Sequence, residues 1–277
     1  MIRIVLCSVL LTLTLAVPAL AAEPELTVSI DGVEQHHARD ALLARSDAVT
    51  VEIPDDVAYG RPMRYRAVPL AALLPADLEP SGISLEAVAT DGFAAQLPAE
   101  LVLGLGDKGA AAFLAIEPGD APWPPLPGKE VSAGPFYVVW VRPEASGVRS
   151  EQWPYQLARI AGVEDPIRRW PQLAVDESLA ADAPERAGQT LFITQCLACH
   201  TLNGAGAASM GPDLNRPMNP TEYMKADALR RLIRDPASVR TWPGQTMPGF
   251  TPDMLSDQEL DHILAYLEHM AARKADP

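Results

Sequence analysis

The chain has 277 residues, of which 36 are acidic and 22 are basic, and its formal net charge is −14. Nucleic acid and an anionic membrane surface are therefore not expected as partners. The length exceeds that of one small domain and predicts two.

The first residues have the composition of a signal peptide. Arg3 supplies a short basic region, residues 4–17 are uncharged and apolar, and Ala19-Leu20-Ala21 fits a small-residue cleavage site. Residues 1–22 are therefore expected to be removed, together with Cys7, and the mature chain is expected to be periplasmic. No other segment is long and apolar enough to predict a membrane span.

Residues 23–172 are predicted to form a β-rich α+β domain. Asp-Gly pairs at 31–32 and 91–92 indicate two hairpin turns. Apolar or alternating segments predict strands at 26–30, 49–53, 85–90, 93–97, 111–116, 136–141 and 155–160. Short helices are predicted at 38–45 and 70–74, and the prolines of 118–127 indicate an extended loop.

Residues 173–184 are predicted to be a linker, because they are polar, rich in alanine and without a clear apolar period. The acidic excess lies before this segment. Residues 22–183 hold 25 acidic and 12 basic residues, whereas residues 184–277 hold 11 and 9. Two interpretations of the acidic part stay open, namely a solvated face, which is commoner, and a docking surface for a basic protein.

Residues 185–277 are predicted to form an all-α domain. One helix runs from Pro184 into a cysteine motif, and another spans about 221–233 and ends before Pro236. Ser256 and Glu259 form a capping box at the start of the last helix. Its apolar residues then repeat at helical spacing: Leu260, Ile263, Leu264 and Leu267.

The motif Cys196-Leu197-Ala198-Cys199-His200 is typical of covalent attachment of a c-type haem. Two thiols at this spacing can each add to a haem vinyl group, and His200 is then the proximal ligand of the iron. A structural zinc site would need four ligands, and the chain has no second cysteine pair. A thioredoxin-like pair would normally open a helix, whereas here a helix precedes the motif. One haem c is therefore expected, and no thiol remains for a structural disulfide.

Several further segments give this region the pattern of a class I cytochrome c, which it resembles along its whole length. These are Gly188 and Phe192, Gly211-Pro212-Asp213-Leu214, Met247-Pro248-Gly249-Phe250 and Ala265-Tyr266-Leu267. The resemblance implies the class I fold, with Gly188 allowing the first helix to cross the last one against Tyr266. It also implies that the Pro212 carbonyl accepts a hydrogen bond from the ring of His200.

Met247 is the predicted sixth ligand, because it lies in a Pro/Gly-bounded loop 47 positions after His200 and matches the family pattern. The other methionines fit core packing or lie outside that pattern: Met210, Met218, Met224, Met254 and Met270. His262 and His269 are alternatives in principle, although both are expected to face solvent. Arg240 and Trp242, just before the loop, are candidates to bind the haem propionates, and surface roles are equally open.

The first domain has a weaker resemblance, to the molybdopterin-binding fold of the sulfite oxidase type. It rests on residues 65–70, 73–74 and 87–93 and on the order of the elements. That family binds molybdenum through a cysteine thiolate, and no cysteine remains here. An arginine cluster for the pterin phosphate is also lacking, since only Arg61, Arg64 and Arg66 lie near one another. No molybdenum is therefore expected. His36-His37 is expected to be an exposed pair without a metal.

Three functions are weighed. The favoured one is an electron-transfer protein between a dehydrogenase and a terminal cytochrome or oxidase, with the first domain as a docking or accessory module and no catalysis of its own. The second is an oxidoreductase whose first domain binds substrate or cofactor and passes electrons to the haem. The third is a sensor in which release of the methionine opens the iron.

Overall fold

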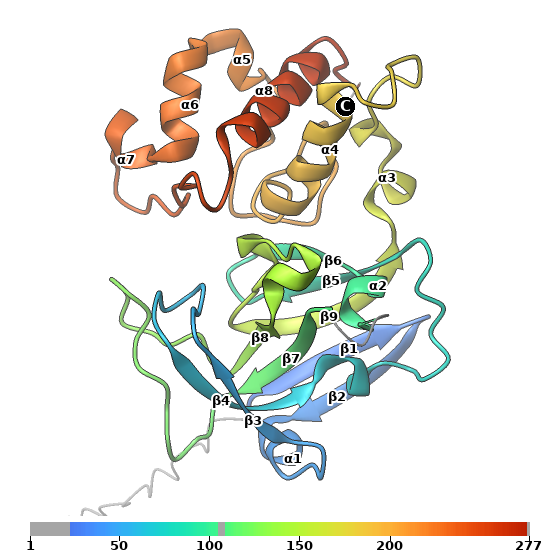
Figure 1. The fold of residues 1–277 in the computed structure, drawn as a ribbon, viewed down its shortest axis with the longest axis vertical. Coiled ribbons are helices and arrows are strands. Elements are labelled where there is room, and N and C mark those ends of the chain that lie inside the picture. The colour runs from blue at the N-terminus through green and yellow to red at the C-terminus, as the bar shows by residue number, and fades with distance from the viewer. Residues whose placement is uncertain (1–22, 105–108, 276–277) are drawn as a thin grey trace, which may run out of the picture.

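The computed structural model describes residues 23–104 and 109–275, which form a β-rich region and a helical region (Figure 1). Each region has its own hydrophobic core. The first core lies in a β-rich region and the second in a helical region, which confirms the predicted two-domain organisation. The predicted signal peptide lies outside the described residues. Within the described part of the chain, no helix has the length and apolar character needed to cross a membrane.

One sheet of the β-rich region has five strands in the order β2-β1-β9-β5-β6. β1 and β9 are parallel, and the other neighbours are antiparallel. The strands are β1 (Glu25–Ile30), β2 (Val33–Ala38), β5 (Ile83–Ala89), β6 (Ala94–Pro98) and β9 (Leu157–Glu164). β1 and β2, and likewise β5 and β6, form the hairpins that the two Asp-Gly pairs predict.

The second sheet is antiparallel and has the strand order β3-β4-β7-β8. Its strands are β3 (Val49–Ile53), β4 (Met63–Pro69), β7 (Ala111–Ile116) and β8 (Phe136–Val141). β2 and β4 were not among the predicted strands. β2 has an exposed, polar sequence, and β4 alternates buried Tyr65 and Ala67 with exposed Arg64 and Arg66.

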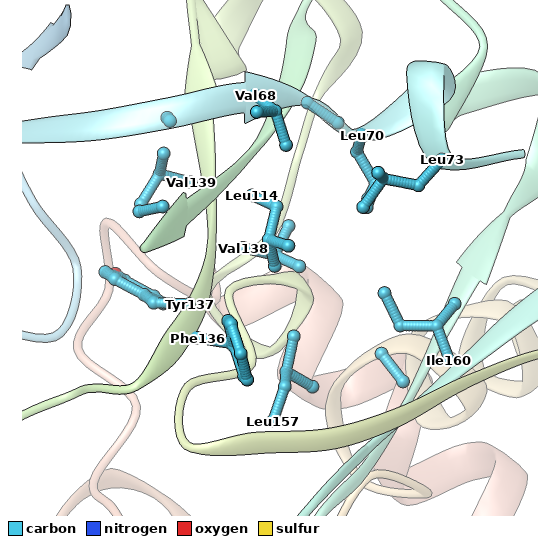
Figure 2. Packing of buried hydrophobic residues seen from close by; sticks show 14 of the residues in the cluster. Val68, Leu70, Leu73, Leu114, Phe136, Tyr137, Val138, Val139, Leu157 and Ile160 are labelled. Atoms are coloured by element: carbon cyan, nitrogen blue, oxygen red, sulfur yellow. The ribbon is translucent and has the colours of Figure 1, made fainter. Parts of the chain in front are cut away.

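The first core lies between these two sheets (Figure 2). Val68, Leu114 and Val138 come from the second sheet, and Leu157 and Ile160 come from β9 of the first. All five side chains are at most 1% exposed. β8 is buried over most of its length and supplies consecutive side chains to this cluster, from Phe136 to Trp140.

Short helical segments connect the strands of the first region. They are α1 (Arg39–Leu43), η1 (Leu70–Leu73), α2 (Ala99–Val102), η2 (Pro143–Ser146) and η3 (Ser150–Gln152). Two more, α3 (Pro166–Arg169) and η4 (Pro171–Leu173), follow β9 and lead to the helical region. The helix predicted at 38–45 is present as α1. The one predicted at 70–74 is the single 3-10 turn η1, which follows β4 directly.

The helical region contains α4 (Pro184–Gln195), α5 (Pro220–Tyr223), α6 (Ala226–Arg234), α7 (Pro236–Val239) and α8 (Asp257–Ala271). The single helix predicted at 221–233 is wrong, because Met224 and Lys225 are extended and separate α5 from α6. Pro236 occupies the first turn of α7. The capping box of α8 is confirmed, since the backbone N–H of Ser256 donates to Glu259 Oε2 at 2.8 Å.

α4 and α8 lie against each other (Figure 1). Gly188 lies at their crossing. A Cβ atom at Gly188 would overlap the carbonyl oxygen of His262 and would lie 2.7 Å from the Cβ of Tyr266. One turn further along α4, the rings of Phe192 and Tyr266 pack with their centroids 5.3 Å apart. This arrangement agrees with the contact that the family resemblance implies.

The segment predicted as a linker packs on the helical region. Leu173 and Val175 are buried members of the second core, and the hydroxyl of Tyr266 donates to the carbonyl of Leu173 at 2.7 Å. Arg186 of α4 donates to several backbone carbonyls of residues 176–180. The segment predicted as a linker is therefore attached to α4 and α8, largely through its backbone carbonyls.

Replacing Gly188 by alanine is expected to lower the free energy of unfolding by about 1–3 kcal/mol, as overpacking of a tight contact does. The loss is expected even though alanine favours a helix over glycine by about 1 kcal/mol. Urea denaturation measures the change. Thr190→Ala, on the exposed side of α4, serves as the control and should be nearly neutral. If both variants unfold at the same urea concentration, the crossing is not tight at Gly188.

Candidate functional site

The cysteine motif forms a helical turn at the end of α4. The N–H groups of Cys199 and His200 both donate to the carbonyl of Cys196, at 3.1 and 2.9 Å. Leu197 and Ala198, between the two cysteines, are 1% exposed and anchor the turn in the protein interior. The turn therefore brings both sulfur atoms and the imidazole of His200 to one place.

The ring of His200 is held by the segment that follows the motif. His200 Nδ1 lies 2.9 Å from the carbonyl oxygen of Pro212, and because that oxygen can only accept, Nδ1 carries the hydrogen. A Cβ atom at Gly211 would lie 2.5 Å from two atoms of the ring, so the glycine leaves the space that the imidazole occupies. Nε2 is then the ring atom with a free lone pair.

Burial lowers the pKa of His200, against the opposing effects of the bond to Pro212 and the charge of Asp213. Its imidazole is therefore neutral at pH 7, as a metal ligand must be. Cys196 and Cys199 are free thiols. Burial, followed by the nearby charge of Glu151, raises the pKa of each thiol to about 12. The sulfur atoms of these free thiols are the ones that would form the two thioether bonds to a haem.

Three buried asparagines, Asn203, Asn215 and Asn219, form a ladder of hydrogen bonds. This asparagine ladder attaches to α8 the segment that runs from His200 to α5. Asn215 Nδ2 donates to Asn203 Oδ1 at 2.8 Å, and Asn219 Nδ2 donates to Asn215 Oδ1 at 2.9 Å. Their amides also donate to the last carbonyls of α8 and beyond, those of Leu267, Met270 and Arg273. The asparagines are at most 2% exposed, and each bond satisfies a group that would otherwise be buried without a partner.

Asp213 closes the loop that carries the motif. Its carboxylate accepts bonds from the backbone N–H groups of Asn203, Gly204, Asn215 and Arg216 and from the hydroxyl of Thr201. Burial alone would raise the pKa of Asp213, but these hydrogen bonds outweigh it and lower the pKa below its ordinary value. The roles of Asp213 and of the asparagines were not predicted from the sequence, because side-chain bonds to distant backbone have no periodic signature.

The loop that contains Met247 is attached to the end of α6. The N–H of Phe250 donates to the carbonyl of Ile233 at 2.9 Å, and Arg234 Nη1 donates to the carbonyl of Phe250 at 2.8 Å. Gly249 packs so closely that a Cβ atom there would lie 2.5 Å from the carbonyl oxygen of Arg234. Met247 is partly buried against the second core. The loop is thereby held beside the core that the cysteine motif also enters.

The two candidates for propionate binding lie on the surface. The guanidinium of Arg240 is 5.9 Å from the ring centroid of Trp242, and the Trp242 side chain is 47% exposed. Arg240 follows α7 directly and is also exposed. Their roles stay predictions.

The alternative iron ligands differ in their surroundings. Met270 is 1% exposed and Met218 is 48% exposed. Met224 and Met254 are partly buried against the second core, as is Met247, and Met210 is also partly buried. The expectation that His262 and His269 face solvent is wrong. Both are partly buried on α8, and His269 Nε2 accepts a hydrogen bond from the N–H of Asp176 at 3.2 Å.

The candidate groups of the first region lie apart from one another. His36 is exposed and lies 3.0 Å from Glu25, whereas its neighbour His37 is partly buried, which corrects the expectation of an exposed pair. Arg64 pairs with Glu52 across β3 and β4 at 2.5 Å. Among residues 23–104 and 109–275, no three His, Cys, Asp or Glu side chains come together as a metal site would require.

The residues of the cysteine turn fit a haem c. The two free thiols lie one helical turn apart, beside a histidine whose Nδ1 is engaged and whose Nε2 is free. Gly211 leaves room for the ring of that histidine to lie flat against its loop.

Residues 185–271 match the family model of cytochrome c. This part of the chain is a cytochrome c domain. It begins in the first turn of α4 and ends with α8, so it includes the cysteine turn, the asparagine ladder and the Met247 loop. Comparison with curated proteins finds no match for the chain.

The low pKa of Asp213 predicts a loss of stability in acid. Its carboxylate stabilises the cytochrome c domain at pH values above the ordinary aspartate pKa of about 3.9, and this contribution disappears as the pH falls through the lower folded value. Asp213→Asn is therefore expected to be less stable than the wild type at pH 7, with the difference shrinking below about pH 4. Urea denaturation from pH 3 to 7 tests this, with the exposed Asp227→Asn as control. A constant difference across that range would contradict the assignment.

Proposed function

We propose that this protein is a periplasmic electron carrier with one covalently bound haem c in a domain of the class I fold. It takes single electrons from a dehydrogenase and passes them to a cytochrome or an oxidase. The observation that carries the proposal is the turn at the end of α4, where Cys196, Cys199 and a neutral His200 with a free Nε2 meet. The match of residues 185–271 to cytochrome c supports it.

Each residue of this turn has a separate task. Cys196 and Cys199 hold the haem through their sulfur atoms, and His200 offers Nε2 to the iron. The hydrogen bond from Nδ1 to the carbonyl of Pro212 fixes the ring orientation and raises the basicity of Nε2. When bound, haem c supplies an iron atom that gains or loses one electron.

Met247 is the proposed sixth ligand. Phe250, three residues later, attaches the loop to the end of α6 and so limits how far the Met247 sulfur can move. A thioether ligand favours the reduced state and gives a high potential compared with two histidines. With His200 and Met247 both bound, no coordination position is open to a substrate or to oxygen, which supports electron transfer over catalysis at the iron.

The second core lies beside this site, since Cys196 and Met247 both pack against it. Its members Phe192, Leu229, Ile233, Leu255 and Leu260 are at most 9% exposed. An apolar surrounding disfavours the more highly charged oxidised site and acts in the same direction as the thioether. Arg240 and Trp242, exposed beyond α7, are proposed to contact the propionates at the edge of the site.

The β-rich domain is proposed to be an accessory or docking module for a redox partner. It carries most of the net negative charge, because residues 22–183 hold 25 acidic and 12 basic residues. Acidic surfaces steer basic partners and speed their association. The proposed signal peptide places this encounter in the periplasm, where covalent haem attachment also takes place.

Full-length protein, produced with its own leader in a host that attaches haem c, is expected to be coloured. It should contain one iron and no molybdenum per chain. The haem should stay with the polypeptide after denaturation and acid extraction. Cys199→Ala, which keeps one thioether, is expected to retain less haem, whereas the exposed Met218→Ala should match the wild type. A colourless wild-type protein, or haem that acid releases completely, would exclude the proposed function.

Met247→Ala is expected to lower the reduction potential on the order of 0.1 V or more, within the roughly 0.8 V range that axial ligands span. It should also abolish the near-infrared sulfur-to-iron absorption and allow carbon monoxide to bind the reduced protein at pH 7. Redox titration and optical spectra measure these changes, again with Met218→Ala as the control. Carbon monoxide binding by the wild type would instead favour the sensor hypothesis, and an unchanged near-infrared band in Met247→Ala would identify another ligand.

A further inference from the structure

The β-rich domain lies directly against the cysteine turn of the cytochrome c domain. The N–H of Ala94, at the start of β6, donates to the carbonyl of Ala198 between the two cysteines at 2.9 Å. The N–H of Ser209 donates in turn to the carbonyl of Gly92 at 3.1 Å. Gly92 packs against Ser209 so tightly that a Cβ atom would overlap its hydroxyl. The β5–β6 hairpin is thus bonded to the segment that would carry the haem.

A second element of the same domain, η3, meets the end of α4. The N–H of Glu151 lies 3.5 Å from Oε1 of Gln195, the residue before Cys196. Arg149, just before η3, forms an ion pair with Glu259 in the first turn of α8. Two attachments, one to each of the crossing helices, therefore fix the position of Glu151 next to the cysteine turn.

The Glu151 carboxyl is partly buried and has few charged neighbours. β6 packs against η3 and has no charged residue. Its one polar side chain, Gln96, is bonded to Ser84 and Glu86. The charged residues of α4, Glu185 and Arg186, lie in its first turn, at the opposite end from Gln195.

The remaining charges near Glu151 are on its flanks. Arg149 is engaged by Glu259 of α8, and Asp91 is exposed on the β5–β6 turn. Burial raises the pKa of Glu151 to about 7, while a hydrogen bond from the Ser150 hydroxyl opposes the rise. The charge of Glu151 acts electrostatically on the cysteine turn. After burial, it is the next largest cause that raises the pKa of the thiols of Cys196 and Cys199.

We propose that Glu151 is a tuning residue, through which the β-rich domain sets the redox potential of the haem held by Cys196 and Cys199. The inference rests on the proposed function. An ionised carboxylate beside the thioether edge stabilises the oxidised iron, which has one more positive charge than the reduced iron. When a one-electron donor protein reduces the iron, that charge is lost and Glu151 takes up part of a proton from solvent. The accessory domain thereby makes the potential depend on pH near neutrality.

The test is a redox titration of the full-length holoprotein from pH 5 to 9. At a fixed applied potential, the ratio of reduced to oxidised wild-type protein is expected to fall on the order of tenfold as Glu151 ionises. A tenfold change corresponds to 59 mV for a one-electron couple. Glu151→Gln is expected to lose this dependence and to match the low-pH wild type throughout. Glu144→Gln, which removes an exposed carboxylate on η2 of the same domain, should follow the wild type.

A second measurement on the wild type does not depend on how well the variant folds. The infrared difference spectrum between reduced and oxidised protein at pH 7 is expected to contain a protonated-carboxyl band that Glu151→Gln lacks. The inference is overturned if the wild-type potential is flat and shows no such band, or if Glu151→Gln follows the wild type at every pH. It is also overturned if Glu144→Gln changes the profile equally. In each of these results the haem spectrum stays intact, whereas failure of the proposed function would appear as absence of the covalent haem itself.

Discussion

The close crossing of α4 over α8 is the contact on which the rest of the cytochrome c domain depends. α4 ends at Cys196, so its position sets where both thiols and His200 lie. Gly188 permits the backbones to approach, and the Phe192–Tyr266 ring contact fixes the angle one turn later. A displacement here would carry the cysteine turn with it, because the N–H groups of Cys196 and Leu197 both donate to the carbonyl of Phe192 in α4.

Around this crossing, hydrogen bonds from polar side chains add to apolar packing in holding the loops of this small domain. The asparagine ladder and Asp213 join the segment after His200 to the carboxyl end of α8 and to its own backbone. Such bonds have fixed lengths and directions, whereas apolar contacts tolerate sliding. They hold the Pro212 carbonyl where it meets the histidine ring, and so connect the loop conformation to the chemistry of the imidazole.

The sequence predicted the parts of this arrangement that have a local cause. The cysteine spacing, the capping box at Ser256 and Glu259, the alternation of β1 and the apolar run of β8 each arise within a few residues, and the structure contains these elements. β2 was missed because its side chains are exposed and polar. The break between α5 and α6 was missed because Met224 and Lys225 are ordinary helix formers that tertiary contacts hold extended. The bond of Glu151 to Gln195 and most bonds of the asparagines join residues more than ten positions apart, and no pattern along the chain records them.

Leu173 has a consequence for how the molecule can be divided. Its side chain is wholly buried in the helical core and its carbonyl accepts the hydroxyl of Tyr266, although it precedes the matched cytochrome c region by more than ten residues. The segment that leaves the first domain at η4 is thus already a structural part of the second, and Arg186 of α4 binds its carbonyls at residues 176–180. A freely swinging tether is excluded by these bonds. An excised haem-binding fragment would therefore have to start upstream of Leu173 to keep the core of the helical region complete.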